Sequence, residues 1–236
     1  MTQLSLTNIE NITVDNDGAV SINASAISGQ SIKLTGDGAN DILILTGTDN
    51  ADTIDLTTQD VKHAGNDVNL TISASKGDDT VKLSEGVDKV ELTVANNGTD
   101  TITGFTSTAD KLDIGALVNA NNSGAVTLTT ATLLAKHGTS IGVSDTKAYV
   151  AKATLKASID TAADIQTALT DTGIFDAVDF VASKTGFLVA YGADDVDLAY
   201  VYGGTMDATA GHASGDTVTL LGTVQSDALL AYGDFA

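Results

Sequence analysis

One short phrase recurs along the first half of the chain, and it restricts the fold more than any other feature. The stretch KGDDTVKLSEGVDKVEL, which begins at Lys76, twice places a glycine, then an aspartate two positions later, then apolar residues two and four positions after the aspartate. The phrase also surrounds Asp67 and Asp100, so that Asp67, Asp79, Asp88 and Asp100 are spaced by 12, 9 and 12 residues. Recurrence at such short spacing predicts a repeat architecture.

Looser copies of the phrase follow Asp41, Asp52 and Asp110. In six of the seven units an apolar residue stands two positions after the aspartate: Leu43, Ile54, Val81, Val90, Ile102 and Leu112. Asp67 is the exception, because Asn69 takes that place between Val68 and Leu70. Period-2 apolar spacing predicts a short half-buried strand, and Gly with Asp predicts the turn before it. No such unit can bury its own apolar face, so we expect the units to stack as a β-solenoid or β-roll.

The chain divides by composition near residue 115, since all ten aromatic residues lie at or after Phe105. Residues 1–115 form the Asp/Gly repeat region, and residues 116–236 are expected to be a β-rich region with one or two short helices. One helix is predicted near residues 161–172, with Asp160 or Thr161 as its N-cap and Gly173 as its end. The segment TATLLAKHG, residues 130–138, is a candidate for a second.

Two strand patterns follow in the same region. FLVAY and VDLAYVY, joined by GADD, predict a β-hairpin, and the paired carboxylates of Asp194 and Asp195 fall in its turn. Near the end of the chain Asp216, Val218 and Leu220 repeat the strand phrase, which predicts that a similar architecture returns there. We therefore expect a mainly β protein.

The charge is strongly acidic, with a formal net charge of −20, 28 Asp, 3 Glu, 11 Lys and no Arg. Such a chain is a poor partner for nucleic acid, whose affinity depends on Lys and Arg at phosphates. The absence of Cys excludes disulfides and thiolate metal sites. The N-terminus lacks the pattern of a classical signal peptide, and the longest uncharged run, residues 114–135, is too polar for a membrane span.

Acidic side chains at successive turns of a stack repel one another, which favours a bound cation, and Ca²⁺ prefers carboxylate and carbonyl oxygens. Three units, at Asp79, Asp88 and Asp100, partly match the calcium-binding nonapeptide G-G-x-G-x-D-x-U-x, although the leading glycine pair is absent from every unit. Asp and Gly are also ordinary turn formers that need no ion. The candidate ligands are Asp37, Asn40, Asp41, Asp49, Asn50, Asp52, Asp67, Asp78, Asp79, Asp88, Asp100 and Asp110.

A family resemblance rests on the opening NIENITVDNDGAVSINASAISGQSIKLTG, the run from NADTIDL to GDDTVKL, and NGTDTITGFTSTADKLDI. These stretches resemble bacterial S-layer and RTX-type surface proteins exported by type I secretion, and the ending DTVTLLGTVQSDALLAYGDF is similar to their C-terminal secretion region. The resemblance covers about residues 8–115 and 186–236. It implies export without an N-terminal signal, calcium-dependent folding outside the cell, and self-assembly into a cell-surface array, with a cell-surface polysaccharide as a further candidate partner.

An enzyme is the main competing class. His63, His137 and His212 do not form a zinc hydrolase motif, and the Gly-x-Ser-x-Gly match GTSIG around Ser140 lacks the strand-turn-helix context of a nucleophile elbow. We therefore expect no catalytic site. The leading interpretation is a calcium-stabilised structural surface-layer protein, and the alternative is a noncatalytic C-terminal RTX-like module of a secreted enzyme or adhesin.

Overall fold

The computed structural model describes residues 9–14, 19–36, 41–58, 60–61, 69–92, 98–113, 132–134, 141–142, 148–152, 163, 178–179, 185–192, 195–205, 217–228, 230 and 234. Within these residues the protein is mainly β, and a 3-10 turn, η1 (Ala24–Ala26), is placed among the strands. Among the described residues there is no helix with the length and apolar character of a membrane span.

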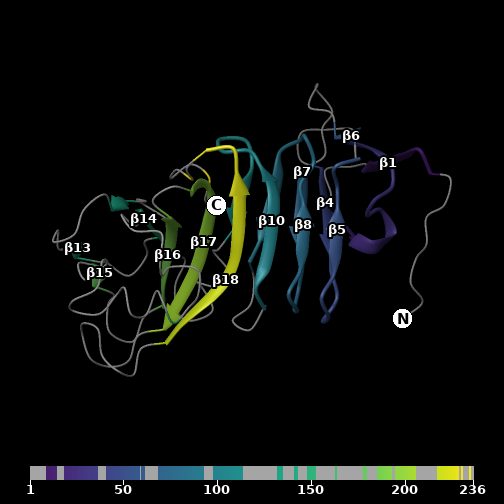
Figure 1. The fold of residues 1–236 in the computed structure, drawn as a ribbon. Helices are drawn as coiled ribbons and strands as arrows, with labels where there is room; N and C mark the ends of the chain where they lie inside the picture. Colours follow the sequence, from purple (N-terminus) through teal and green to yellow (C-terminus); the bar gives the residue numbers. More distant parts are fainter. Residues whose placement is uncertain are drawn as a thin grey trace.

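The first half of the chain winds through three parallel sheets. Sheet A contains β1 (Asn11–Val14), β3 (Lys33–Gly36) and β6 (Asp60–Val61). Sheet B contains β2 (Ala19–Asn23), β4 (Ile42–Thr46), β7 (Asn69–Ser73), β9 (Asp88–Glu91) and β11 (Lys111–Asp113). Sheet C begins with β5 (Thr53–Asp55), β8 (Thr80–Lys82) and β10 (Asp100–Phe105), which lie side by side in Figure 1. Successive strands alternate between sheets, so the chain forms a β-solenoid, as the repeat predicts.

The core of the solenoid is built from the repeat's apolar positions. All six residues that stand two after an aspartate are at most 1% exposed. They line up across coils: Ile54, Val81 and Ile102 are register partners in sheet C. Burying a large apolar side chain is worth roughly 1.5 to 3 kcal/mol, so these columns hold the stack together. The predicted strand phrase is confirmed.

The uneven spacing of the repeat has a structural reason. Thr53, Thr80 and Thr101 are neighbours in sheet C, so successive coils contain 80 − 53 = 27 and 101 − 80 = 21 residues. The longer coil includes β6 of sheet A between β5 and β7, whereas in the later coil β8 of sheet C is followed directly by β9 of sheet B. Consecutive repeat units therefore belong to opposite sheets, and one coil contains two units.

Sheet C continues into the second half of the chain through β18 (Thr217–Ser226), β17 (Asp195–Thr205), β16 (Thr185–Gly192), β14 (Ala148–Lys152) and β12 (Thr132–Leu134). The predicted hairpin is confirmed, because β16 and β17 pair antiparallel and close at Gly192 and Asp195. A two-stranded sheet pairs β13 (Ile141–Gly142) with β15 (Val178–Asp179). The helix predicted near residues 161–172 lies outside the described residues, apart from Ala163, which is helical, and Ser140 also lies outside them.

The second predicted short helix, residues 130–138, is wrong where the structure describes it. Thr132, Leu133 and Leu134 form β12, which pairs in parallel with β14. A short apolar run is compatible with a strand as well as with a helical turn. Here it forms a strand because its backbone pairs with the edge of β14.

The end of the chain returns to the solenoid, as the phrase near Asp216 predicts. Strand β18 pairs antiparallel with β17 and, on its other edge, parallel with β10. Its Val224 joins the sheet C apolar column opposite Ile102 and is fully buried. Leu230, farther along, is 3% exposed. The closing strand therefore extends the stack of parallel strands beside β10, although Ile102, the register partner of Val224, lies 224 − 102 = 122 positions earlier in the chain.

Candidate functional site

Several repeat aspartates accept hydrogen bonds from the residue four positions earlier and so hold their own turns together. In the turn before β9, Asp88 Oδ2 accepts hydrogen bonds from the backbone N–H of Ser84 (2.8 Å) and from its hydroxyl (3.0 Å). The same i−4 arrangement recurs in two other turns, in which Asp52 is bonded to Thr48 N and Oγ1 and Asp110 to Thr106 N. A carboxylate that accepts backbone N–H groups fixes a tight turn without help from another chain segment.

The same aspartates also join one coil to the next. Asp79 Oδ1 accepts the backbone N–H of Asp52 at 2.7 Å, and Asp100 Oδ1 accepts that of Asp79 at 3.1 Å. On the opposite sheet Asp110 Oδ1 accepts the N–H of Asp88 at 2.9 Å. We call Asp52, Asp79 and Asp100 the sheet C stack, and Asp88 and Asp110 the sheet B stack. At each step of a stack, one hydrogen bond joins a backbone N–H of one coil to an aspartate carboxylate of the next coil. The stack aspartates therefore link adjacent coils.

Burial sets the electrostatics of both stacks. Asp79 and Asp100 are 1% exposed, and Asp88 and Asp110 are fully buried. Burial raises the pKa of Asp79, against the hydrogen bond from Asp52, and the charges of Asp52 and Asp78 raise it further. Burial likewise raises the pKa of Asp110, against its bonds from Thr106 and Asp88. A raised pKa means that the folded state binds the proton more tightly, so these two groups oppose folding at neutral pH and do so less as the pH falls.

Glycine is required where the turns of adjacent coils approach each other. Gly77 and Gly98 have φ of 108° and 101°, a region that side chains disfavour. A Cβ on Gly77 would lie 2.6 Å from Asn50 C and from Ala51 N in the preceding coil. Gly77 and Gly98, two positions before Asp79 and Asp100, are therefore packing requirements of the stack, whereas Asn50 stands at that place before Asp52.

The structure separates the predicted metal ligands into groups with different surroundings. Asp52, Asp79 and Asp100 lie together with Asp78, whose Oδ1 accepts from Thr99 N at 2.8 Å. Asp49 and Asn50 are exposed, and Asp49 is paired with Lys76 at 2.7 Å. Asp88 and Asp110 lie together in the sheet B stack, and Asp41 is buried just before β4. The remaining predicted ligands, Asp37, Asn40 and Asp67, lie outside the described residues.

A calcium ion would need more than side-chain carboxylates in the part of the chain that the structure describes. There, no group of three or more His, Cys, Asp or Glu side chains is placed to hold a metal ion. The carboxylate that fits an ion best is Asp79, because its buried Oδ2 accepts no hydrogen bond from any described residue and two acidic neighbours raise its pKa. Backbone carbonyls of the turns are the remaining oxygen donors.

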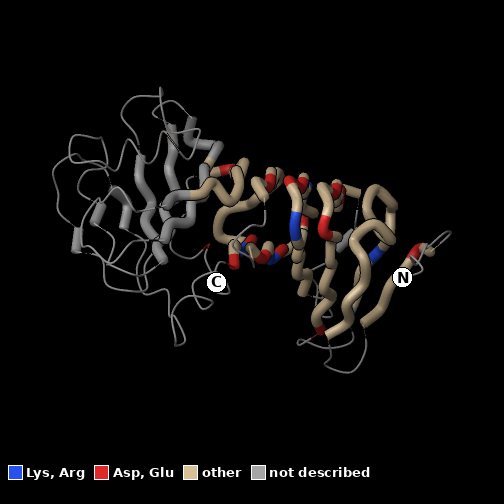
Figure 2. Tube along the Cα trace, turned by 90° about the horizontal axis from the view of Figure 1, so that it is seen from below, with Lys and Arg blue, Asp and Glu red and all other residues tan. Residues whose placement is uncertain are grey.

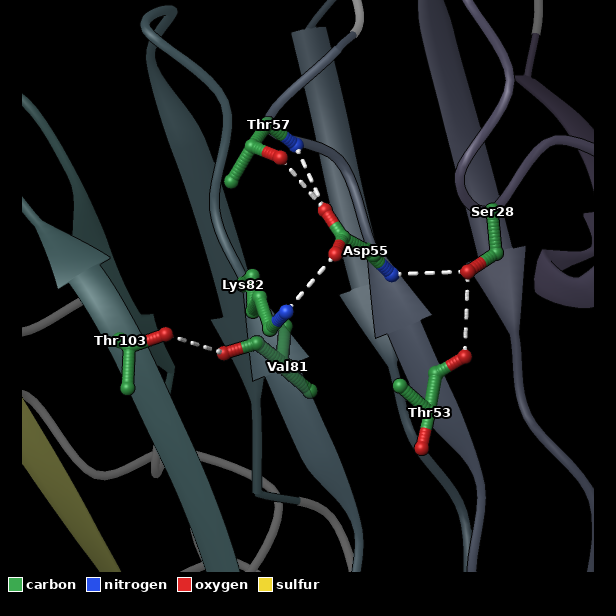
Figure 3. Close-up of polar contacts among 7 residues, drawn as sticks. All are labelled: Ser28, Thr53, Asp55, Thr57, Val81, Lys82 and Thr103. Carbon is green, nitrogen blue, oxygen red and sulfur yellow. Dashed lines mark hydrogen bonds and ion pairs between the residues drawn. The ribbon is translucent and has the colours of Figure 1, made fainter.

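An outer row of polar contacts, absent from the sequence-based predictions, ties the exposed face of sheet C across coils (Figure 3). Asp55 Oδ2 pairs with Lys82 Nζ at 2.9 Å, and its Oδ1 accepts from the hydroxyl of Thr57 at 2.6 Å. These contacts, the Thr57 bond first, lower the pKa of Asp55 to about 2. The Asp55 backbone N–H bonds Ser28 Oγ at 2.8 Å. The signal for this pair was available, since Asp55 and Lys82 each stand three after a stack aspartate.

A second missed group lies where the C-terminal segment meets the solenoid. Asp234, fully buried, accepts from Ser107 Oγ at 2.9 Å and from Thr108 N at 2.7 Å. Asp227 Oδ1 accepts from Ser107 N at 2.8 Å. The C-terminal segment thus continues the use of aspartate for holding turns, and Figure 2 shows acidic residues recurring along the successive coils.

Comparison of the sequence with protein-family models and with curated proteins found no match.

Proposed function

We propose that this chain is a structural, noncatalytic protein of a bacterial surface layer, which assembles with further copies of itself into an extracellular array. The observation that carries the proposal is the pair of aspartate stacks. Their carboxylates hold turns and join coils, so the stack aspartates serve the scaffold. A rigid, repetitive body is what an array component needs, and it is built here without disulfides.

Calcium is part of the proposal, at the sheet C stack. Asp79 lies with Asp52, Asp78 and Asp100, and burial, followed by the charges of Asp52 and Asp78, raises the pKa of Asp79. A Ca²⁺ ion held by Asp79 and turn carbonyls would offset the charge and stabilise only the folded state. At about 100 times the dissociation constant, one such site contributes roughly 2.7 kcal/mol.

Export by type I secretion through the C-terminal residues is proposed from the resemblance of the sequence ending. The folded structure uses the same residues differently, because Leu230 and Asp234 are buried against the solenoid. An export apparatus would therefore engage this segment before it docks. Secretion of an unfolded chain, followed by folding in extracellular calcium, satisfies both roles.

A noncatalytic module of a secreted enzyme or adhesin is the second candidate, and one observation favours it. Val20 in β2 is the register partner of the fully buried Leu43, yet it is 42% exposed. An inward position that is left open at the end of a solenoid suits a body that is covered by a further segment or partner.

Electron micrographs of the purified chain at millimolar calcium and in excess chelator test the proposal. We expect ordered sheets or filaments with calcium and dispersed particles with chelator. Particles that stay dispersed at every calcium and protein concentration would favour the module over the surface-layer protein. Calorimetric titration with calcium in parallel separates ion binding from assembly.

A further inference from the structure

We propose that the edge of β10, together with the Thr106–Asp110 turn, is an exchangeable docking site for the paired strands β17 and β18 and the described residues that follow them, Asp227, Ala228, Leu230 and Asp234, filled by the same chain in the structure and by a second copy in assemblies. The inference rests on the proposed self-assembly and names the surface through which it occurs. The site is the open side of the last solenoid coil, because β8 already occupies the other edge of β10. Without β18, this edge would be unpaired in sheet C.

The docked strand fits its site closely at one position. Gly222 is the register partner of Asp100, where the sheet C stack ends, and a Cβ there would lie 2.7 Å from the Asp100 carbonyl oxygen. Each inner coil has an aspartate at this position, whereas the closing strand has no side chain there. The C-terminal segment is therefore shaped to end the stack.

The rest of the contact is made by buried apolar side chains of the segment and by hydrogen bonds between the segment and residues 105–108. Leu221, Val224 and Leu230 are at most 5% exposed, and Asp227 and Asp234 accept three hydrogen bonds from Ser107 and Thr108. The Asp227 N–H also donates to the Phe105 carbonyl at 3.1 Å. The residues in these bonds are as much as 127 positions apart in the sequence. None of these bonds depends on which copy supplies the segment.

Because β18 pairs antiparallel with β17 as well as parallel with β10, we expect the two strands to be exchanged together. Chain connectivity gives a limited advantage to the docking seen within one chain. The effective concentration of a tethered partner is about millimolar for short linkers and falls as the connection lengthens. In a crowded surface layer, a neighbouring copy therefore competes for the site. Reciprocal exchange between two copies gives a closed dimer, and serial exchange gives an open chain of copies, which is the geometry that an array requires.

A cross-linking experiment on full-length variants tests the exchange, and the natural absence of cysteine makes it clean. Thr101 and Thr223 are register partners on adjacent strands, and neither is buried. The variants Thr101→Cys and Thr223→Cys are mixed in denaturant, refolded together at high concentration with calcium, and treated with a short bismaleimide. Thr53→Cys replaces Thr101→Cys in the control mixture, because Thr53 is exposed in the same row but two strands from β10.

We expect a cross-linked dimer that contains both variants in the first mixture and none in the control. The double variant Thr101→Cys/Thr223→Cys, refolded when dilute, is expected to cross-link within one chain and thereby reports correct docking. Adding Gly222→Val to the Thr223→Cys chain is expected to abolish the mixed dimer. If the double variant cross-links within the chain while the mixture gives no dimer, the exchange is overturned.

The same samples distinguish this inference from the proposed function. Ordered arrays in micrographs without mixed dimers would overturn the exchange and leave the surface-layer proposal standing. Mixed dimers without arrays would support the exchange and contradict the surface-layer proposal. Absence of both would refute each of them.

Discussion

Replacing the buried carboxylate of Asp110 should destabilise the solenoid even when calcium is absent. Asp110 is fully buried and accepts the N–H groups of Asp88 at 2.9 Å and Thr106 at 2.7 Å. In Asp110→Ala the buried Asp88 N–H loses its acceptor, which costs about 1 to 3 kcal/mol, and the more exposed Thr106 N–H loses a bond worth about 1 kcal/mol. Relief of the buried charge acts in the opposite direction, so we expect a net loss of about 2 kcal/mol.

Urea unfolding followed by circular dichroism, in excess chelator, measures this loss. With a slope of about 2 kcal/mol per molar urea, the midpoint should fall by about 1 M. Asp110→Asn keeps one acceptor oxygen and should show a smaller loss. The matched control is Asp49→Ala, because Asp49 is an exposed repeat-turn aspartate, and its removal should change stability by less than about 0.5 kcal/mol. Equal effects of Asp110→Ala and Asp49→Ala would refute the structural role assigned to the stacks.

Four further outcomes are expected. Gly222→Val should lower the thermal midpoint, because its side chain meets a β10 carbonyl at the end of the sheet C stack, and an unchanged midpoint would contradict that close approach. The pKa of Asp55 is lowered to about 2, so its charge stabilises the folded state above pH 3.8, and this contribution is lost as the pH falls towards 2. Urea melts of Asp55→Asn should therefore show a smaller loss of stability between about pH 4 and pH 2 than those of the unmodified protein. Asp79→Ala should weaken calcium binding in calorimetric titrations whereas Asp195→Ala should not, and equal losses would indicate a diffuse acidic surface in place of a site. Deleting residues 229–236 should both destabilise the purified protein and abolish its release by a type I apparatus, and normal export of the shortened chain would place the signal elsewhere.

The solenoid could be predicted from sequence because its information is local. An aspartate with an apolar residue two positions later specifies a turn and an inward-facing side chain, and each of the six such apolar residues, from Leu43 to Leu112, is buried. The alternation of consecutive units between sheets B and C could not be derived in this way. It depends on how many residues each turn spans, because β1, β3 and β6 add a third side in sheet A, whereas strands β7 to β11 alternate between sheets B and C alone.

The stack aspartates could be predicted as residues of the candidate site, but the chemistry of their carboxylates could not. A carboxylate at a turn can accept backbone N–H groups or bind Ca²⁺, and the local sequence is the same in both cases. The threonine or serine four positions earlier, as in Ser84 before Asp88, was the overlooked signal for the first role. Asp234 could not be placed at all, because its partners Ser107 and Thr108 are more than 120 positions away and no local pattern encodes that contact.

Hydrogen exchange at single backbone amides, measured by NMR in the presence of chelator, tests the central claim that repeat aspartates hold one coil to the next. The amides of Asp52, Asp79 and Asp88 donate to carboxylates of the following coil, so they should exchange far more slowly than in the unfolded chain. In Asp110→Ala, the amide of Asp88 should lose protection while that of Asp79 keeps it. Rapid exchange of all three amides in the unmodified protein, or unchanged protection of Asp88 in the variant, would contradict the claim.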